Sequence, residues 1–143
     1  MDIFEILNNL QLESNIKLDE IPEIDLYMDQ VIQLFESKLS EQKRKEDEKI
    51  LTKTMINNYA KGKLLLPIKN KKYSKEHIIL MSLIYNLKGA LSINDIKLSL
   101  EEIINKSEGE KYPLRELYSC FLEDCINDEK NFKEDVISKI ENI

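Results

Sequence analysis

The most restrictive feature of this sequence is a segment that is apolar on nearly every side. Residues 75–88 follow Ser74, a candidate helix cap, and precede Gly89. A helix that is hydrophobic all round must be buried by other elements. The sequence therefore predicts a central core helix between Ser74 and Gly89, covered by further helices. Its large apolar side chains are Ile78, Ile79, Leu80, Met81, Leu83, Ile84, Tyr85 and Leu87.

The rest of the chain favours helices as well. Only three glycines and three prolines occur in 143 residues, so the breakers that many tight hairpins need are scarce. The length and a hydrophobic content of 42% suit one compact core. Apolar residues recur at three- and four-residue spacing, which predicts amphipathic helices, in residues 24–39, 51–61, 93–105, 114–125 and 132–140.

Charge is distributed very unevenly along the chain. The net charge is −6, but residues 51–88 carry eight lysines and one acid, Glu76. Residues 1–50 carry 6 basic and 13 acidic side chains, and residues 89–143 carry 7 and 13. Because like charges repel, this concentration of lysine predicts a polyanionic partner for the middle segment. The alternative is that the lysines only solvate a surface loop.

Residues 51–61 predict a short amphipathic helix with a polar outward face. Thr52 is a candidate N-cap, and an apolar stripe runs from Leu51 to Ala60. Asparagine is a poor helix former, but it can pair through two hydrogen bonds with adenine, and threonine can contact a thymine methyl group. The asparagines could equally reflect the general Asn, Lys and Ile content of the chain. The outward face comprises Thr54, Asn57, Asn58 and Lys61.

The segment that follows predicts a small basic β wing. After Gly62 an extended stretch leads to a turn of asparagine and lysine, and the chain returns to end at Tyr73. Such a pattern is typical of two short antiparallel strands joined by a turn. We expect the wing to span residues 66–73.

The order of these parts resembles the DNA-binding domain of the mercury-resistance-regulator (MerR) family. Residues 54–65 correspond to the family's recognition helix and leucine pair, Pro67 to its proline, and residues 71–74 to its basic wing and Tyr-Ser cap. The segment LSINDI at residues 91–96 corresponds to its final helix. The similarity covers residues 51–105, with residues 24–39 as the first helix.

Longer stretches are similar to a second family. IPEIDLYMDQV and LTKTMINNYAKGKLLLPIKNKKYSKEHII resemble a bacterial family known only as a domain of unknown function, DUF1836. Together, the two resemblances imply an all-α protein with a small two-stranded β wing, that is, a winged helix-turn-helix of MerR type with extra terminal helices. We expect three parts: an N-terminal helical arm (1–22), the winged domain (23–105) and a C-terminal helical tail (106–143).

Several positions depart from the MerR pattern. Asn57 and Asn58 stand where that family has arginine and the first of two tyrosines, and Lys63 replaces a common glycine. Lys71 stands where the family's wing has an arginine that binds phosphate. Lysine keeps the positive charge but lacks the guanidinium group that forms two parallel hydrogen bonds to a phosphate. MerR proteins dimerise through a long helix, which Gly109 and Pro113 would interrupt here. A homodimer would therefore use the N-terminal arm or the C-terminal helices.

These features predict a cytoplasmic transcriptional regulator that binds double-stranded DNA in a sequence-specific way. The helix at residues 52–62 would enter the major groove, and the wing at residues 66–73 would contact the phosphate backbone. The alternative is a helical protein-interaction module built on the same fold. The predicted DNA-binding residues are Thr52, Lys53, Thr54, Asn57, Asn58, Lys61, Lys63, Lys69, Lys71, Lys72, Tyr73 and Lys75.

No pattern in the sequence predicts an enzyme. The only histidine, His77, lacks a catalytic constellation around it, and the glycines are isolated rather than grouped in a phosphate-binding loop. Cys120 and Cys125 have neither redox nor zinc spacing, so we expect buried, reduced thiols. We expect no cofactor, no metal and no membrane segment. The acidic start of the chain does not resemble a secretion signal.

Overall fold

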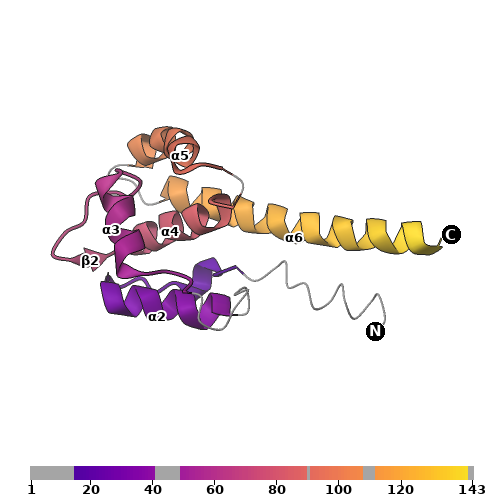
Figure 1. Ribbon diagram of the computed structural model, residues 1–143, viewed down its shortest axis with the longest axis horizontal. Helices are drawn as coiled ribbons and strands as arrows, with labels where there is room; N and C mark the ends of the chain where they lie inside the picture. The colour runs from indigo at the N-terminus through magenta and orange to yellow at the C-terminus, as the bar shows by residue number, and fades with distance from the viewer. Residues whose placement is uncertain (1–14, 41–48, 90, 108–111, 142–143) are drawn as a thin grey trace.

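Helix α4 (Lys75–Leu87) lies at the centre of the molecule, as predicted. Its residues from Lys75 to Ile84 are all buried. Ser74 caps the helix, because its Oγ accepts a hydrogen bond from the backbone N–H of His77 at 3.3 Å. Figure 1 shows the other helices arranged around it.

The computed structural model describes residues 15–40, 49–89, 91–107 and 112–141, and in these ranges the protein is mainly helical with one small sheet. None of the helices in these ranges combines the length and the apolar character that crossing a bilayer requires. The remaining elements are η1 (Leu18–Glu20), β1 (Leu26–Tyr27), α2 (Met28–Leu39), α3 (Lys53–Lys61), β2 (Lys72–Tyr73), α5 (Ile93–Ser107) and α6 (Tyr112–Glu141).

The two strands do not pair as the sequence predicts. The wing pattern predicts pairing with the stretch just before its own turn, but β2 pairs antiparallel with β1, with Leu26 opposite Tyr73 and Tyr27 opposite Lys72. Only an isolated bridge between Lys69 and Lys72 closes the turn itself. Burial explains the choice, because pairing with β1 places Leu26 and Tyr73 together on the core side.

The C-terminal tail is one helix and not two. The sequence predicts separate helices at residues 114–125 and 132–140, but both stretches lie within α6. Pro113 is the second residue of this helix. Proline is tolerated in a first helical turn because the backbone N–H groups of that turn make no hydrogen bond within the helix, so none is lost. The first part of α6 packs against α4, α5 and η1, and the second part extends beyond the other helices (Figure 1).

The two cysteines lie on α6 and correct a second expectation. Both are free thiols, but Cys120 is exposed and Cys125 is half-buried, so the prediction of buried thiols is wrong. On the described part of this helix the buried residues are Leu114, Tyr118 and Glu129; Cys125 lies two turns after Tyr118 on the same face, and Cys120 lies on the opposite face. Partial burial, together with nearby carboxylates, raises the pKa of the Cys125 thiol.

The core also includes residues before the first long helix. Ile16 and Ile21 are buried in the same cluster as α2 and α4, and the Tyr118 hydroxyl of α6 donates to the Ile16 carbonyl. The apolar pattern places Ile24 in the first helix, but this residue is 71% exposed and α2 begins only at Met28. Residues 1–14 of the predicted N-terminal helical arm lie outside the described residues.

Candidate nucleic-acid interface

Helix α3 presents a polar face to solvent, and its opposite, apolar face is packed into the core. Thr52 is its N-cap, because the Thr52 Oγ1 accepts from the Met55 N–H at 3.1 Å, as the sequence predicts. Ile56 and Tyr59 are buried beneath the helix. The outward face therefore stays fixed toward solvent, and its exposed residues are Thr54, Asn57, Asn58 and Lys61.

The C-terminal end of α3 turns sharply into a basic loop, residues 63–72. The Leu64 N–H donates to the Tyr59 carbonyl at 2.9 Å, and the Lys63 N–H donates to the Ala60 carbonyl at 3.1 Å. This is a Schellman motif, whose residue after the cap takes the left-handed conformation and is usually glycine. Here that residue is Lys63, with φ 59°. The neighbouring Gly62 has an ordinary φ of −77°.

A second left-handed position lies at the far end of the basic loop. Asn70 and Lys71 have φ values of 55° and 56°, and the Lys72 N–H donates to the Lys69 carbonyl at 3.1 Å. Two successive positive φ angles match a type I′ turn, for which Asn-Gly is the strongest preference. Lysine therefore occupies the position where glycine would be least strained.

His77 fastens the start of the basic loop to α4. The ring is 5% exposed, and its Nδ1 accepts from the Ser74 N–H at 2.9 Å. The proton must then lie on Nε2, which donates to the Leu66 carbonyl at 2.9 Å and contacts the Pro67 carbonyl at 3.2 Å. The sole histidine thus has a structural role at the base of the loop.

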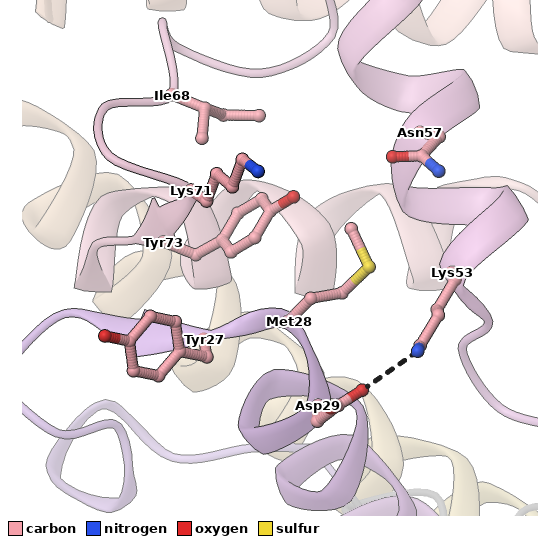
Figure 2. Close-up of a pocket in the computed structure, with 8 residues that line it drawn as sticks. All are labelled: Tyr27, Met28, Asp29, Lys53, Asn57, Ile68, Lys71 and Tyr73. Carbon is pink, nitrogen blue, oxygen red and sulfur yellow. Dashed lines mark ion pairs between the residues drawn. The ribbon is translucent and has the colours of Figure 1, made fainter.

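An open cleft of about 570 Å³ lies between α3, the basic loop and the start of α2 (Figure 2). Asn57 points into it from α3, and Lys71 points into it from the turn. The Lys53 Nζ lies 3.3 Å from Asp29 Oδ1, and both side chains are well exposed. The cleft is lined by Tyr27, Met28, Asp29, Lys53, Asn57, Ile68, Lys71 and Tyr73.

The structure brings most of the predicted residues to α3 and the basic loop. Thr52 is half-buried as the helix cap, and Lys72 is half-buried with its ammonium 5.2 Å from the centre of the Tyr27 ring. Lys53 is exposed and shares a salt bridge with Asp29. The other exposed members are Thr54, Asn57, Asn58, Lys61, Lys63, Lys69 and Lys71.

Two predicted contact residues need correction. Tyr73 is 4% exposed, and burial raises the pKa of its hydroxyl. Lys75 is 6% exposed, and its Nζ lies 3.1 Å from Glu23 Oε1. Both side chains face inward because Tyr73 lies on the core side of the sheet and Lys75 begins the buried helix α4. Neither belongs to the exposed contact set.

Lys75 is part of an ion-pair network that joins three segments of the chain. Arg115, near the start of α6, binds Glu23 through two hydrogen bonds of 3.2 and 2.9 Å and contacts Glu76 at 3.1 Å. The hydrogen bonds from Lys75 and Arg115 lower the pKa of Glu23. The network ties the segment before β1 to α4 and α6.

Sequence reasoning missed Tyr27, Met28 and Asp29, which line the cleft. Their segment carries only a helical pattern, and nothing local in it indicates that Tyr27 pairs with Lys72.

Comparison with known proteins identifies a family for most of the chain. A family model described as a domain of unknown function (DUF1836) matches residues 16–121, which include the whole of the interface. No curated protein and no solved structure matches the chain.

Proposed function

Because this chain belongs to the DUF1836 family, whose description assigns no activity, we propose a function from the interface itself: sequence-specific binding of double-stranded DNA as a transcriptional regulator. The proposed scaffold is a winged helix-turn-helix of MerR type, in which α2 and α3 form the helix-turn-helix and the basic loop with β2 forms the wing. The proposal assigns the protein to the cytoplasm and includes no catalytic step, cofactor or metal.

In this proposal, α3 lies in the major groove. Thr54, Asn57 and Asn58 would face the base edges, since short polar side chains on an exposed helical face can reach them. The lysines of α3 and the basic loop would contact phosphates on either side of the groove. Exposed lysines available for this purpose are Lys61, Lys63, Lys69 and Lys71.

The observation that carries the proposal is the pair of left-handed lysines. Lys63 and Lys71 occupy two of the three loop positions with positive φ, at 59° and 56°, and the third is Asn70. For a residue with a Cβ atom, this conformation costs about 1–2 kcal/mol. Such strain gathers at functional sites, where the side chain has a use that offsets its cost. Two strained lysines on one loop support a role in binding an anionic partner.

Charge reversal on the loop tests the proposal. If the four exposed lysines contact phosphates, log K should fall with log salt at about −0.9 per contact. The double variant Lys69→Glu/Lys71→Glu should therefore weaken duplex binding severely and make the salt slope shallower by about 1.8 for each bound protomer. Fluorescence anisotropy with a labelled mixed-sequence duplex at several salt concentrations measures both quantities.

The matched control is Lys17→Glu/Lys88→Glu, which makes the same charge change at two exposed positions away from the loop and from the second part of α6. This control should retain nearly all of the affinity and the original slope. Equal losses in the two double variants would mean that only net charge matters. An unchanged slope in the loop variant would rule out phosphate contacts by Lys69 and Lys71.

We propose a homodimer as the DNA-binding form, joined through the second part of α6. The helical stripe that packs Leu114 and Tyr118 into the core continues along α6, where Phe132 and Ile140 are 49% and 41% exposed. Acidic and basic side chains both flank this part of the helix, as Asp135 and Lys139 do. Charges of both signs suit a second copy of the same helix in antiparallel pairing.

The same exposed stripe also favours the alternative function, a helical module that binds another protein. Co-purification with another protein distinguishes this alternative from DNA binding. A stable complex with a different protein, together with no retention on heparin or duplex DNA at low salt, would replace the regulator by this alternative.

A further inference from the structure

We propose that the base pairs read by α3 are predominantly A·T. This inference rests on the proposed function and specifies the class of duplex that the interface selects. It depends on three properties of the exposed face: two free amides, an adjoining apolar wall, and the absence of an unpaired arginine among the described residues.

The amides come from Asn57 and Asn58. Both side chains are exposed, and neither amide makes a hydrogen bond with any described residue. Asparagine is one of the poorer helix formers, so two in succession in a nine-residue helix weaken it. An asparagine amide reads adenine through two hydrogen bonds, because its nitrogen donates to N7 and its oxygen accepts from the N6 amine. A free, exposed amide can present both groups to the groove.

Apolar groups adjoin these amides. Met28 and Ile68 lie across the cleft from Asn57, and both are half-buried (Figure 2). Thr54 adds an exposed methyl group one helical turn before Asn58. In the major groove, thymine is distinguished by its C5 methyl group, which apolar side chains and threonine contact. The face therefore offers groups for both members of an A·T pair.

Arg115 is engaged elsewhere, and the proposed function assigns the exposed lysines, Lys61 and Lys71 among them, to phosphates. Guanine is most often read by a basic side chain, but Arg115 is held by Glu23 and Glu76, and Lys53, beside Asn57, is paired with an acid. That acid is Asp29, whose Oδ1 lies 3.3 Å from the Lys53 Nζ. The other arginine of the sequence, Arg44, lies outside the described residues.

Competition between two duplexes tests the inference. They have equal length, one containing only A·T pairs without homopolymer tracts and the other only G·C pairs. Each two-pronged asparagine–adenine pair should favour the A·T duplex by roughly 5- to 150-fold. The variant Asn57→Ala/Asn58→Ala should lose this preference and keep the salt slope, because no phosphate contact is removed. Asn94→Ala, at an exposed position in α5, is the matched control and should behave as the wild type.

A gain-of-function variant makes the test sharper. Asn57→Arg supplies the missing guanidinium and should shift the preference toward the G·C duplex. Equal binding of both duplexes by the wild type would overturn the A·T inference and leave DNA binding intact. A preference that persists in Asn57→Ala/Asn58→Ala would also overturn it, since DNA shape would then be the cause. Failure of the wild type to bind any duplex would overturn both the inference and the proposed function.

Discussion

Lys63 and Lys71 are the residues at which conformation and chemistry conflict most clearly. Each holds a left-handed backbone that glycine adopts freely, and each projects from the loop beside α3. A loop optimised for stability alone would have glycine at both positions. The conflict makes opposite predictions for folding and for binding, so the two roles can be separated by experiment.

Replacing either lysine by glycine should stabilise the fold and weaken DNA binding. Lys63→Gly and Lys71→Gly remove the strain of a Cβ atom at positive φ, so the free energy of unfolding should rise by up to about 1 kcal/mol. Each also removes one phosphate contact, and the duplex affinity should fall. Urea denaturation and fluorescence anisotropy measure the two effects.

The control for this pair is Lys69→Gly. Lys69 lies in the same loop without a positive φ, so it should lose affinity without gaining stability. If Lys71→Gly bound duplex as tightly as the wild type, its strain would have no function in binding.

Local hydrogen-bond chemistry makes some residue roles predictable and leaves others hidden. Thr52 and Ser74 can be identified as helix caps, because a cap depends only on the residues just after it. The sequence places Tyr73 and Lys75 at the DNA surface, but they are buried, because their exposure depends on distant residues of the segment around β1. Sequence spacing carries no information about such partners.

Among the elements, the helices could be predicted well and the strand pairing could not. The boundaries of α3 and α4 follow from apolar periodicity and capping residues. The pairing of β1 with β2 joins two-residue strands far apart in the chain, which are too short to show a pattern. The sequence divides α6 in two because a polar stretch interrupts its apolar stripe, but an exposed helix tolerates polar residues on every side.

The basic loop depends on His77 as an anchoring element. His77→Ala would leave the Ser74 N–H and the Leu66 carbonyl without their partners, so the free energy of unfolding should fall by about 1–3 kcal/mol. Duplex affinity should also fall, although no loop lysine is lost, because the loop is no longer held against α4. His77→Gln, which retains a donor and an acceptor, should recover part of both. Normal affinity in a folded His77→Ala protein would show that the anchor is dispensable for binding.

The contact between α4 and α6 should make stability depend on alkaline pH. The Tyr118 hydroxyl lies 2.8 Å from Ser82 Oγ, and burial raises its pKa to about 12. A raised pKa means that the folded state holds this proton more tightly, so its contribution is complete below about pH 10 and is lost as pH rises toward 12.

Denaturation curves measured from about pH 8 to about pH 11 check this dependence. Tyr118→Phe should be less stable than the wild type at neutral pH, because Ser82 and the Ile16 carbonyl lose a partner. Its stability should then fall less steeply above about pH 10. A small alkaline loss should remain, since burial also raises the pKa values of Tyr59 and Tyr73. Parallel pH profiles for the two proteins would contradict the assignment.

At the scale of the whole molecule, the interface and α6 are joined through one core. Arg115 at the start of α6 contacts Glu23, in the segment before β1, and Glu76, in the first turn of α4. Helix α6 then extends away from that core (Figure 1), and Phe132 and Ile140 are exposed on it. A dimer formed there would hold two interfaces in a fixed relation, as paired half-sites in DNA require.

The proposed dimer predicts that Phe132→Glu yields a monomer. A carboxylate in the middle of the apolar stripe would be buried without a partner on dimerisation, which is strongly unfavourable. Light scattering coupled to size exclusion should report a dimer for the wild type and a folded monomer for the variant. The control is Asn127→Glu, which adds the same charge at an exposed position on the same helix and should remain a dimer. A wild-type monomer at all concentrations would exclude this mode of assembly.

The most direct measurement of the central claim is an NMR titration of the isotope-labelled protein with a duplex containing A·T pairs. The account predicts that amide shift changes concentrate in α3 and the basic loop, at residues 53–72, and that the second part of α6 stays unchanged. Changes confined to α6, or spread evenly over the surface, would contradict a DNA interface built from α3 and the basic loop.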